Sequence, residues 1–171
     1  MIIFITGGAR SGKSSYAQQL ALSLSTHPVY VATAKVWDDD FGQRIQRHQH
    51  ERDNRWTNME EQRDLTTLSL DNKVCVIDCV TLWLTNFFMD TKNDVDAALV
   101  LFKHQIDALS KRPGNFIIIS NEIGMGVHAE TPIGRKFTDL QGWANQYISA
   151  AADKVILMVS GIPLTIKSPT T

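Results

Sequence analysis

Residues 7–14 of the chain read Gly7-Gly8-Ala9-Arg10-Ser11-Gly12-Lys13-Ser14. This stretch matches G-x-x-x-x-G-K-[ST], the pattern of a phosphate-binding loop, or P-loop. An apolar run over residues 2–5 directly precedes it, and a helical pattern over residues 14–24 follows it. A P-loop requires this order of strand, loop and helix, so the context supports the motif and predicts a P-loop fold.

The glycines and the helix start explain why such a loop binds phosphate. Glycine reaches backbone angles that other residues avoid, so successive N–H groups can point into one concavity. The helix start adds the positive end of its dipole. We expect all eight residues to bind a nucleotide, Lys13 to reach its β- and γ-phosphates as a catalytic group, and Ser14 to ligate Mg²⁺. The loop alone does not decide the reaction, since NTPases, kinases, switches and transferases all use it.

Further apolar runs and helical patterns alternate along the rest of the chain. The apolar runs cover residues 29–32, 74–78, 116–120 and 155–159. The helical patterns cover residues 39–51, 97–110 and 135–151. Such alternation favours a mostly parallel sheet with helices on both faces. We therefore expect an α/β, P-loop NTPase-like fold in one nucleotide-binding domain over residues 1–171, with a loose tail at 168–171.

Composition narrows the class of protein. The chain has 171 residues, of which 43% are hydrophobic and 20% charged, as in a globular domain. The net charge is −1 without a long basic run, so we expect no nucleic-acid partner. No apolar stretch reaches about 18 residues and no basic signal segment opens the chain, which favours a cytoplasmic protein without a membrane span. Cys75 and Cys79 lack a metal-binding spacing and are expected to be buried hydrophobes in a reducing compartment.

Two acids follow predicted strands. Asp78 ends the run at 74–78, and Glu122 comes shortly after the run at 116–120. Ligands of open α/β sheets bind at the carboxyl ends of the strands. Asp78 is therefore a candidate Mg²⁺-associated carboxylate, and Glu122 a candidate metal ligand, base or substrate-orienting group. The alternatives are a helix cap or an ordinary strand-end acid for Asp78, and a structural role for Glu122. Thr81 and Asn86 are either polar contacts in the site or residues of a helix start.

A third candidate group lies at steps of four residues. Asp40, Arg44, His48 and Arg52 share one face if this segment is helical. Two arginines one turn away from a histidine repel each other unless an anion lies between them, and a polyphosphate is a suitable anion. Nearby arginines also favour the neutral imidazole that a nucleophile requires. The alternative is a solvated helix of mixed charge.

Six ordered motifs together cover essentially the whole chain. They are the P-loop, Ala32-Thr33-Ala34, Arg44-Ile45 with His48, Arg52 and Trp56, the run from Asp78 to Asn86, Asn121-Glu122 with Gly124-Met125-Gly126, and Ser160-Gly161-Ile162-Pro163-Leu164. In this combination the chain resembles the bifunctional adenosylcobinamide kinase / adenosylcobinamide-phosphate guanylyltransferase family of cobalamin synthesis.

The resemblance implies two reactions and a homotrimer. ATP or GTP first phosphorylates adenosylcobinamide, and GTP then donates GMP to that phosphate, giving adenosylcobinamide-GDP and pyrophosphate. In such proteins GMP is first held covalently on a histidine, which is His48 here. From their spacing, Arg44 and Arg52 are expected to stabilise charge around the transferred phosphoryl group. Further guanine-nucleotide contacts are implied for Gln49, His50, Glu51, Arg52, Ala32, Thr33, Ala34, Glu60 and Asp78.

The chain departs from the family pattern at three places. Several members carry Glu at the position of Asp78, some carry a second histidine at the position of Arg47, and many have Val-Pro-Glu where residues 127–130 read Val-His-Ala-Glu. None of these departures removes an essential group. Two other functions stay open: a simple P-loop kinase with His48 as a bystander, and a GTP-dependent binding module. Four aromatic residues fit either an interface or the core, with the core favoured for at least half: Trp37, Phe41, Phe87 and Phe88.

Overall fold

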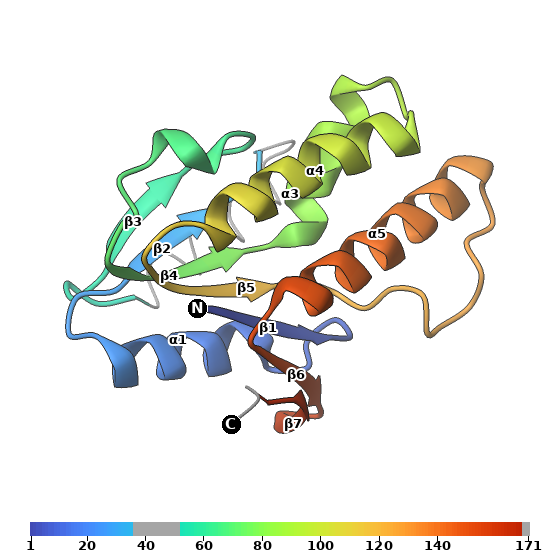
Figure 1. The fold of residues 1–171 in the computed structure, drawn as a ribbon. Helices are drawn as coiled ribbons and strands as arrows, with labels where there is room; N and C mark the ends of the chain where they lie inside the picture. Colours follow the sequence, from blue (N-terminus) through green and yellow to red (C-terminus); the bar gives the residue numbers. More distant parts are fainter. Residues whose placement is uncertain (36–51, 169–171) are drawn as a thin grey trace.

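A computed structural model describes residues 1–35 and 52–168. In these ranges one sheet has the strand order β3-β2-β4-β5-β1-β6-β7 (Figure 1). Its strands are β1 (Ile2–Gly7), β2 (Val29–Ala32), β3 (Thr57–Glu60), β4 (Lys73–Asp78), β5 (Gly114–Ile119), β6 (Lys154–Val159) and β7 (Ile162–Lys167). The helices are α1 (Lys13–Leu24), α3 (Val80–Asp90), α4 (Val95–Ser110) and α5 (Pro132–Ala151), with a 3-10 turn η1 (Leu65–Thr67).

The sheet is parallel except for β7, which pairs antiparallel with β6. Helix α1 covers one face, and α3, α4 and α5 cover the other (Figure 1). Successive side chains of β1 alternate between the two resulting cores: Ile3 and Ile5 pack with α1, whereas Ile2 and Phe4 pack on the side of the other helices. The expected α/β, P-loop NTPase-like class, with helices on both faces, is confirmed.

All five predicted strands are present, with ends within two residues of the expected ones. Three of the predicted helices are present as well, and the fourth, over residues 39–51, lies outside the described residues. Strands β3 and β7 were not predicted, and α3 was anticipated only as the alternative of a helix start near Thr81. Phe87 and Phe88 are buried in the core, as favoured, while Trp37 and Phe41 lie outside the described residues. No helix in the described ranges is long and apolar enough to cross a membrane.

The parallel strands bring their carboxyl ends to one edge of the sheet. The P-loop leaves β1 at this edge, Asp78 ends β4, and β5 lies between these two strands. Residues Ala32, Glu60 and Asp78 are register partners at the ends of three adjacent strands, with Ala32 in the middle. The predicted nucleotide-binding positions on β2, β3 and β4 are therefore neighbours in space.

Candidate nucleotide and metal site

The P-loop has a backbone that only glycine fits at two positions. Gly7 has a φ of 153°, and a Cβ there would lie 2.5 Å from the carbonyl oxygen of Met158. Gly12 has a φ of 92°, and a Cβ there would lie 3.2 Å from Gly161 Cα. L side chains avoid both angles, and real Cβ atoms do not approach within 2.5 Å of a carbonyl oxygen, whereas the 3.2 Å contact at Gly12 is tight. Both glycines therefore fix the shape of the loop.

The turn between β6 and β7 packs directly against the P-loop. The Gly161 N–H donates a hydrogen bond to the Ser11 carbonyl oxygen at 3.0 Å. Ser160 and Gly161 both have positive φ, 51° and 84°, so the turn reverses tightly enough to reach the loop. In the sequence this Ser-Gly pair was part of a family motif; in the structure it packs against the P-loop.

Lys13 is held inside its own loop. The side chain is buried, and Nζ donates to the Gly8 carbonyl oxygen at 2.6 Å, with Ser11 Oγ at 3.4 Å. Burial of the ammonium lowers the pKa of Lys13 below its ordinary value, against an opposing effect of the nearby Asp78 carboxylate. The amine thus lies inside the P-loop, within hydrogen-bond distance of Gly8.

Ser14 and Asp78, the two predicted metal ligands at the P-loop, are in direct contact. Ser14 Oγ donates to Asp78 Oδ2 at 2.9 Å. The helix-cap interpretation of Asp78 is wrong, because the residue that caps α3 is Cys79 and no side chain serves as its cap. Donating its proton to Asp78 leaves the lone pairs of the Ser14 hydroxyl available to a cation.

This donor set fits Mg²⁺. A hydroxyl and a carboxylate are hard oxygen ligands, and Mg²⁺ is commonly bound by one or two protein groups together with substrate phosphates. Within residues 1–35 and 52–168, no three His, Cys, Asp or Glu side chains form a metal-binding cluster. A cation at Ser14 and Asp78 would take further oxygen ligands from nucleotide phosphates and water.

Tyr30 is a member of this site that the sequence analysis missed. Its hydroxyl donates to the same Asp78 Oδ2 at 2.6 Å. Burial, followed by the charge of Asp78, raises the pKa of Tyr30 well above its ordinary value, so the phenol stays a donor. The only signal in the sequence was a single hydroxyl within the apolar strand β2.

Arg52 lies on the ring of Tyr30. Its guanidinium carbon is 3.7 Å from the ring centroid, and its Nε donates to Asn58 Oδ1 at 2.7 Å. Trp56 meets the same ring edge-on, with centroids 6.0 Å apart. The predicted nucleotide contact Arg52 is thus buried against the ring whose hydroxyl bonds to Asp78.

Thr33 and Asn86 connect the segments that follow β2, β3 and β4 by hydrogen bonds. Thr33 donates from N–H to the Asp78 carbonyl at 3.1 Å and from Oγ1 to the Cys79 carbonyl at 2.8 Å. Asn86 Nδ2 donates to the carbonyls of Thr33 and Gln62, both at 2.9 Å. Asn86 is therefore a buried connector on α3 and not a helix-start residue.

Behind the strand ends lies a buried polar network. Ser120 Oγ donates to Asn145 Oδ1 at 2.7 Å, and Gln141 Nε2 donates to both of them. Asn145 Nδ2 donates to the Asn121 carbonyl, and Asn121 donates in turn to Thr81 Oγ1 from its N–H and Nδ2. The network connects the end of β5 to α3 and α5.

Glu122 reaches the P-loop through its backbone. Its N–H donates to the Gly7 carbonyl at 2.9 Å, while its Oε1 accepts from the Gly124 N–H at 2.8 Å. The structure thus places Glu122 beside the start of the loop, with its carboxylate engaged by its own turn. Its role as a metal ligand stays a prediction. Five predicted residues lie outside the described ranges: Arg44, His48, Gln49, His50 and Glu51.

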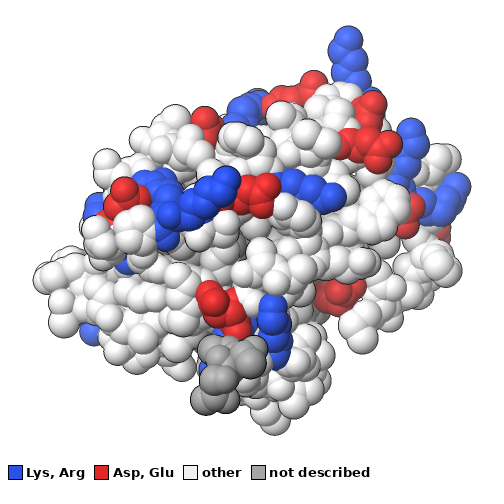
Figure 2. All heavy atoms as spheres, in the orientation of Figure 1, with Lys and Arg blue, Asp and Glu red and all other residues white. Residues whose placement is uncertain are grey.

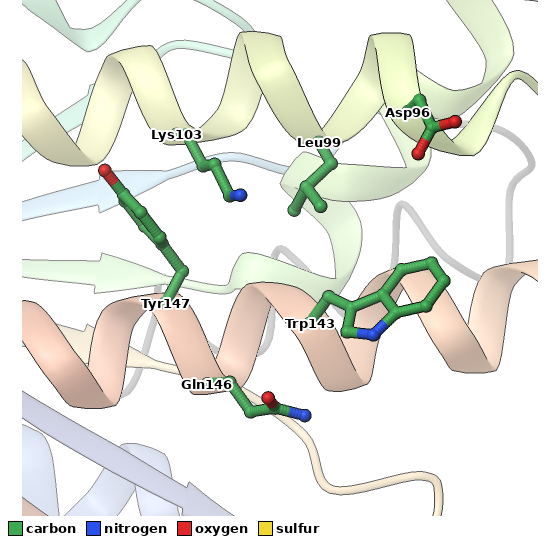
Figure 3. A pocket seen from close by; sticks show the side chains of 6 residues that line it. All are labelled: Asp96, Leu99, Lys103, Trp143, Gln146 and Tyr147. Atoms are coloured by element: carbon green, nitrogen blue, oxygen red, sulfur yellow. The ribbon is translucent and has the colours of Figure 1, made fainter.

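A separate hollow lies between α4 and α5. It has a volume of about 470 Å³ and is lined by Asp96, Leu99, Lys103, Trp143, Gln146 and Tyr147. Figure 3 shows that these side chains come from the two helices and from none of the strand ends. The hollow is thus no part of the P-loop site.

The face drawn in Figure 2 carries acidic and basic side chains interspersed, in a chain whose net charge is −1.

The loop, its lysine and the Ser14–Asp78 pair define a P-loop nucleotide-binding protein. A type III secretion system ATPase from pathogenic bacteria shares the fold, with a TM-score of 0.54 and 13% identity over 91% of this chain and 50% of that one. Residues 3–166 match the family described as cobinamide kinase / cobinamide phosphate guanyltransferase, and the chain belongs to this family of enzymes.

Named relatives agree with the family match. The bifunctional adenosylcobalamin biosynthesis protein CobU of Escherichia coli (strain K12) is 35% identical over 98% of this chain and 100% of its own length. The bifunctional adenosylcobalamin biosynthesis protein CobP of Pseudomonas aeruginosa is 35% identical over 95% of both chains. The likeness therefore spans the whole described fold.

Proposed function

We propose that this protein phosphorylates adenosylcobinamide with ATP or GTP and then transfers GMP from GTP, through a covalent intermediate on His48, to form adenosylcobinamide-GDP in cobalamin biosynthesis. The observation that carries the proposal is the hydrogen bond from Ser14 to Asp78. It joins the P-loop to the acid that the family resemblance assigns to the nucleotide site, in a chain that belongs to that family.

In the kinase half, the P-loop holds the triphosphate. Its N–H groups and the start of α1 bind phosphate oxygens, and Lys13 exchanges the Gly8 carbonyl for the β- and γ-phosphates. Ser14 and Asp78 hold Mg²⁺, which when bound neutralises charge on the phosphates. Because Lys13 is buried, water competes weakly with phosphate for its ammonium.

In the guanylyltransferase half, a nitrogen of His48 attacks the α-phosphorus of GTP. The new N–P bond forms as the bond to the leaving pyrophosphate breaks. An oxygen of adenosylcobinamide phosphate then attacks the same phosphorus, and the N–P bond breaks to regenerate the histidine. Arg44 and Arg52 stabilise the transferred group. The stacking of Arg52 on Tyr30 supports this role, since Arg52 follows His48 by four residues and packs on the ring whose hydroxyl bonds to Asp78.

We extend the proposal to the setting of the enzyme. The family resemblance supports a cytoplasmic homotrimer of one nucleotide-binding domain each. The remaining nucleotide contacts are assigned to the strand ends and to the segment around His48. They are Ala32, Thr33, Ala34, Gln49, His50, Glu51 and Glu60, with Glu122 as a further metal ligand.

The reaction order gives a direct test. Purified protein with adenosylcobinamide, Mg²⁺ and ATP should yield only adenosylcobinamide phosphate, and subsequent GTP should convert it to adenosylcobinamide-GDP, as followed by chromatography and mass spectrometry. Formation of adenosylcobinamide phosphate without adenosylcobinamide-GDP, at any GTP concentration, would indicate a simple kinase. GTP binding with neither product would leave a nucleotide-dependent binding module.

A further inference from the structure

We propose that Tyr30 is a positioning residue that couples Arg52 to the Asp78 carboxylate. Through Tyr30, the guanidinium of Arg52 helps to hold the carboxylate in its metal-binding orientation at the P-loop. This inference rests on the proposed function, because it assumes that Asp78 holds Mg²⁺ with a bound nucleotide. It adds a residue that neither the family motifs nor the predicted site contained.

The hydroxyl side of Tyr30 fixes the orientation of Asp78. Tyr30 and Ser14 donate to the same oxygen, Oδ2, at 2.6 and 2.9 Å. A carboxylate oxygen has two lone pairs in its plane, so two donors on one oxygen define the rotation of the whole group. The position of the other oxygen, Oδ1, is therefore fixed by the two hydrogen bonds that Tyr30 and Ser14 donate to Oδ2.

The ring side of Tyr30 carries Arg52. The guanidinium lies 3.7 Å from the ring centroid, at the contact distance of a cation–π pair, and Arg52 is only 9% exposed. Its Nε is held at 2.7 Å by Asn58 Oδ1. Tyr30 and Asn58 are register partners on adjacent strands β2 and β3. Arg52 is therefore clamped between two cross-strand neighbours, and a shift of its guanidinium acts directly on the ring.

Rigidity makes the ring a suitable connection. Tyr30 is 5% exposed, and Trp56 packs against its edge, so the phenol has little room to rotate independently. A tyrosine has two side-chain torsions and a planar ring, so displacement of one face moves the hydroxyl. Ligands that engage Arg52 thereby alter the hydrogen bond that holds Asp78.

The test uses Tyr30→Phe, which keeps the ring and the Arg52 stacking but removes the hydroxyl. The readout is the Mg²⁺ concentration needed for half-maximal binding of the α,β-methylene analogue of GTP, measured by calorimetry, which requires neither turnover nor a corrinoid. Loss of a hydrogen bond to a charged group should raise this concentration about tenfold. Binding of the analogue in EDTA should stay within about twofold, because the phosphate contacts of the loop remain.

A matched control removes another phenol that donates to a carboxylate. Tyr147, which lines the hollow between α4 and α5 (Figure 3), donates to Asp107 Oδ1 at 2.5 Å. Tyr147→Phe should leave the Mg²⁺ requirement unchanged. A Mg²⁺ requirement in Tyr30→Phe equal to that of the wild type would overturn the proposal.

The coupling itself is tested in a double-mutant cycle. Arg52→Met should raise the Mg²⁺ requirement about threefold in the wild type and not at all in Tyr30→Phe, because its effect passes through the hydroxyl. Equal effects in both backgrounds would contradict the coupling. If Tyr30→Phe does not fold, Asn58→Leu releases Arg52 from the exposed β3 edge without touching Asp78, and an unchanged Mg²⁺ requirement there would overturn the proposal as well.

These outcomes are independent of the covalent chemistry. A protein that forms no guanylylated histidine still gives a Mg²⁺ titration of analogue binding. Failure of the proposed function and failure of the Tyr30 coupling are therefore seen in different experiments.

Discussion

Ser14 Oγ donates a hydrogen bond to Asp78 Oδ2 at 2.9 Å although the strand that leads into the P-loop, β1, and the strand that ends at Asp78, β4, are separated by β5. The contact is possible because the helix after the loop turns back across the sheet, and α1 packs on β4 and β5 as well as β1. One hydroxyl thus joins the P-loop to the acid at the end of β4.

Asp78→Asn should lower the rate of corrinoid phosphorylation about a hundredfold or more, because it removes the negative charge on which the bound cation depends. Asp78→Glu keeps the charge and should retain at least about a tenth of the rate. Initial rates at saturating ATP over a range of Mg²⁺ concentrations provide the measurement. Asp107→Asn, remote from the P-loop, is the control, and equal losses in Asp107→Asn and Asp78→Asn would contradict the assignment.

Two glycine-to-alanine changes should have opposite effects on the free energy of unfolding. Gly7→Ala places a Cβ 2.5 Å from the Met158 carbonyl oxygen and should lower the free energy of unfolding by about 2–4 kcal/mol, with loss of nucleotide binding. Gly142→Ala lies within α5 with nothing within 4 Å of the new Cβ, and should raise that free energy by about 0.5–1 kcal/mol. Urea denaturation measures both. A Gly7→Ala protein as stable as the wild type would refute the fixed loop geometry.

Asn145→Ala should destabilise the protein by about 1–3 kcal/mol, because it removes the acceptor of Ser120 and Gln141 inside the buried network. The change also frees the Asn121 carbonyl, so hydrogen exchange in the loop that follows β5 should become faster. Gln146→Ala, at an exposed position one residue further along α5, is the matched control and should have little effect on either quantity. Equal effects of the two changes would argue against a role for the network.

The two thiols should make the protein sensitive to alkali. Burial raises the pKa of both Cys75 and Cys79 from 9.0 to about 12. Well below pH 9 both thiols are protonated in the folded and in the unfolded state, and their contribution to stability is complete. As the pH rises from about 9 toward 12, the unfolded chain releases protons that the folded chain retains, and each thiol costs about 1.4 kcal/mol of stability per pH unit.

Urea unfolding at pH 8 and pH 10 measures this loss, and a variant with alanine at both cysteines should show a shallower decline. At pH 8 neither thiol should react with a thiol reagent until the chain unfolds, since the thiolate is the reactive form. Rapid labelling of either cysteine in the folded protein would contradict the assigned burial.

Local sequence patterns were sufficient for part of the site. The P-loop is a contiguous motif, so its pattern and flanking elements determine where Lys13 and Ser14 lie. Asp78 was predicted because parallel strands end at a common edge. Tyr30 was missed because its contact with Asp78 depends on the register between β2 and β4, which no local pattern records.

The missed elements have physical explanations. Strand β3 is mostly exposed and polar, and β7 alternates exposed Ile and Leu with Pro, Thr and Lys, so neither has the continuous apolar run used to predict buried strands. Helix α3 begins two residues after β4 and carries apolar residues on most sides, so it lacks the one-sided apolar spacing that marks the other helices and was predicted only as an alternative.

Incorporation of radiolabel from GTP labelled at the α-phosphate into the denatured protein tests the central claim most directly. The proposed function predicts label that is labile to acid and stable to alkali, as a phosphoramidate should be, and that is absent from His48→Ala but present in His104→Ala, which alters an exposed histidine of α4. Undiminished label in His48→Ala, or no label in a wild-type protein that binds GTP, would contradict it.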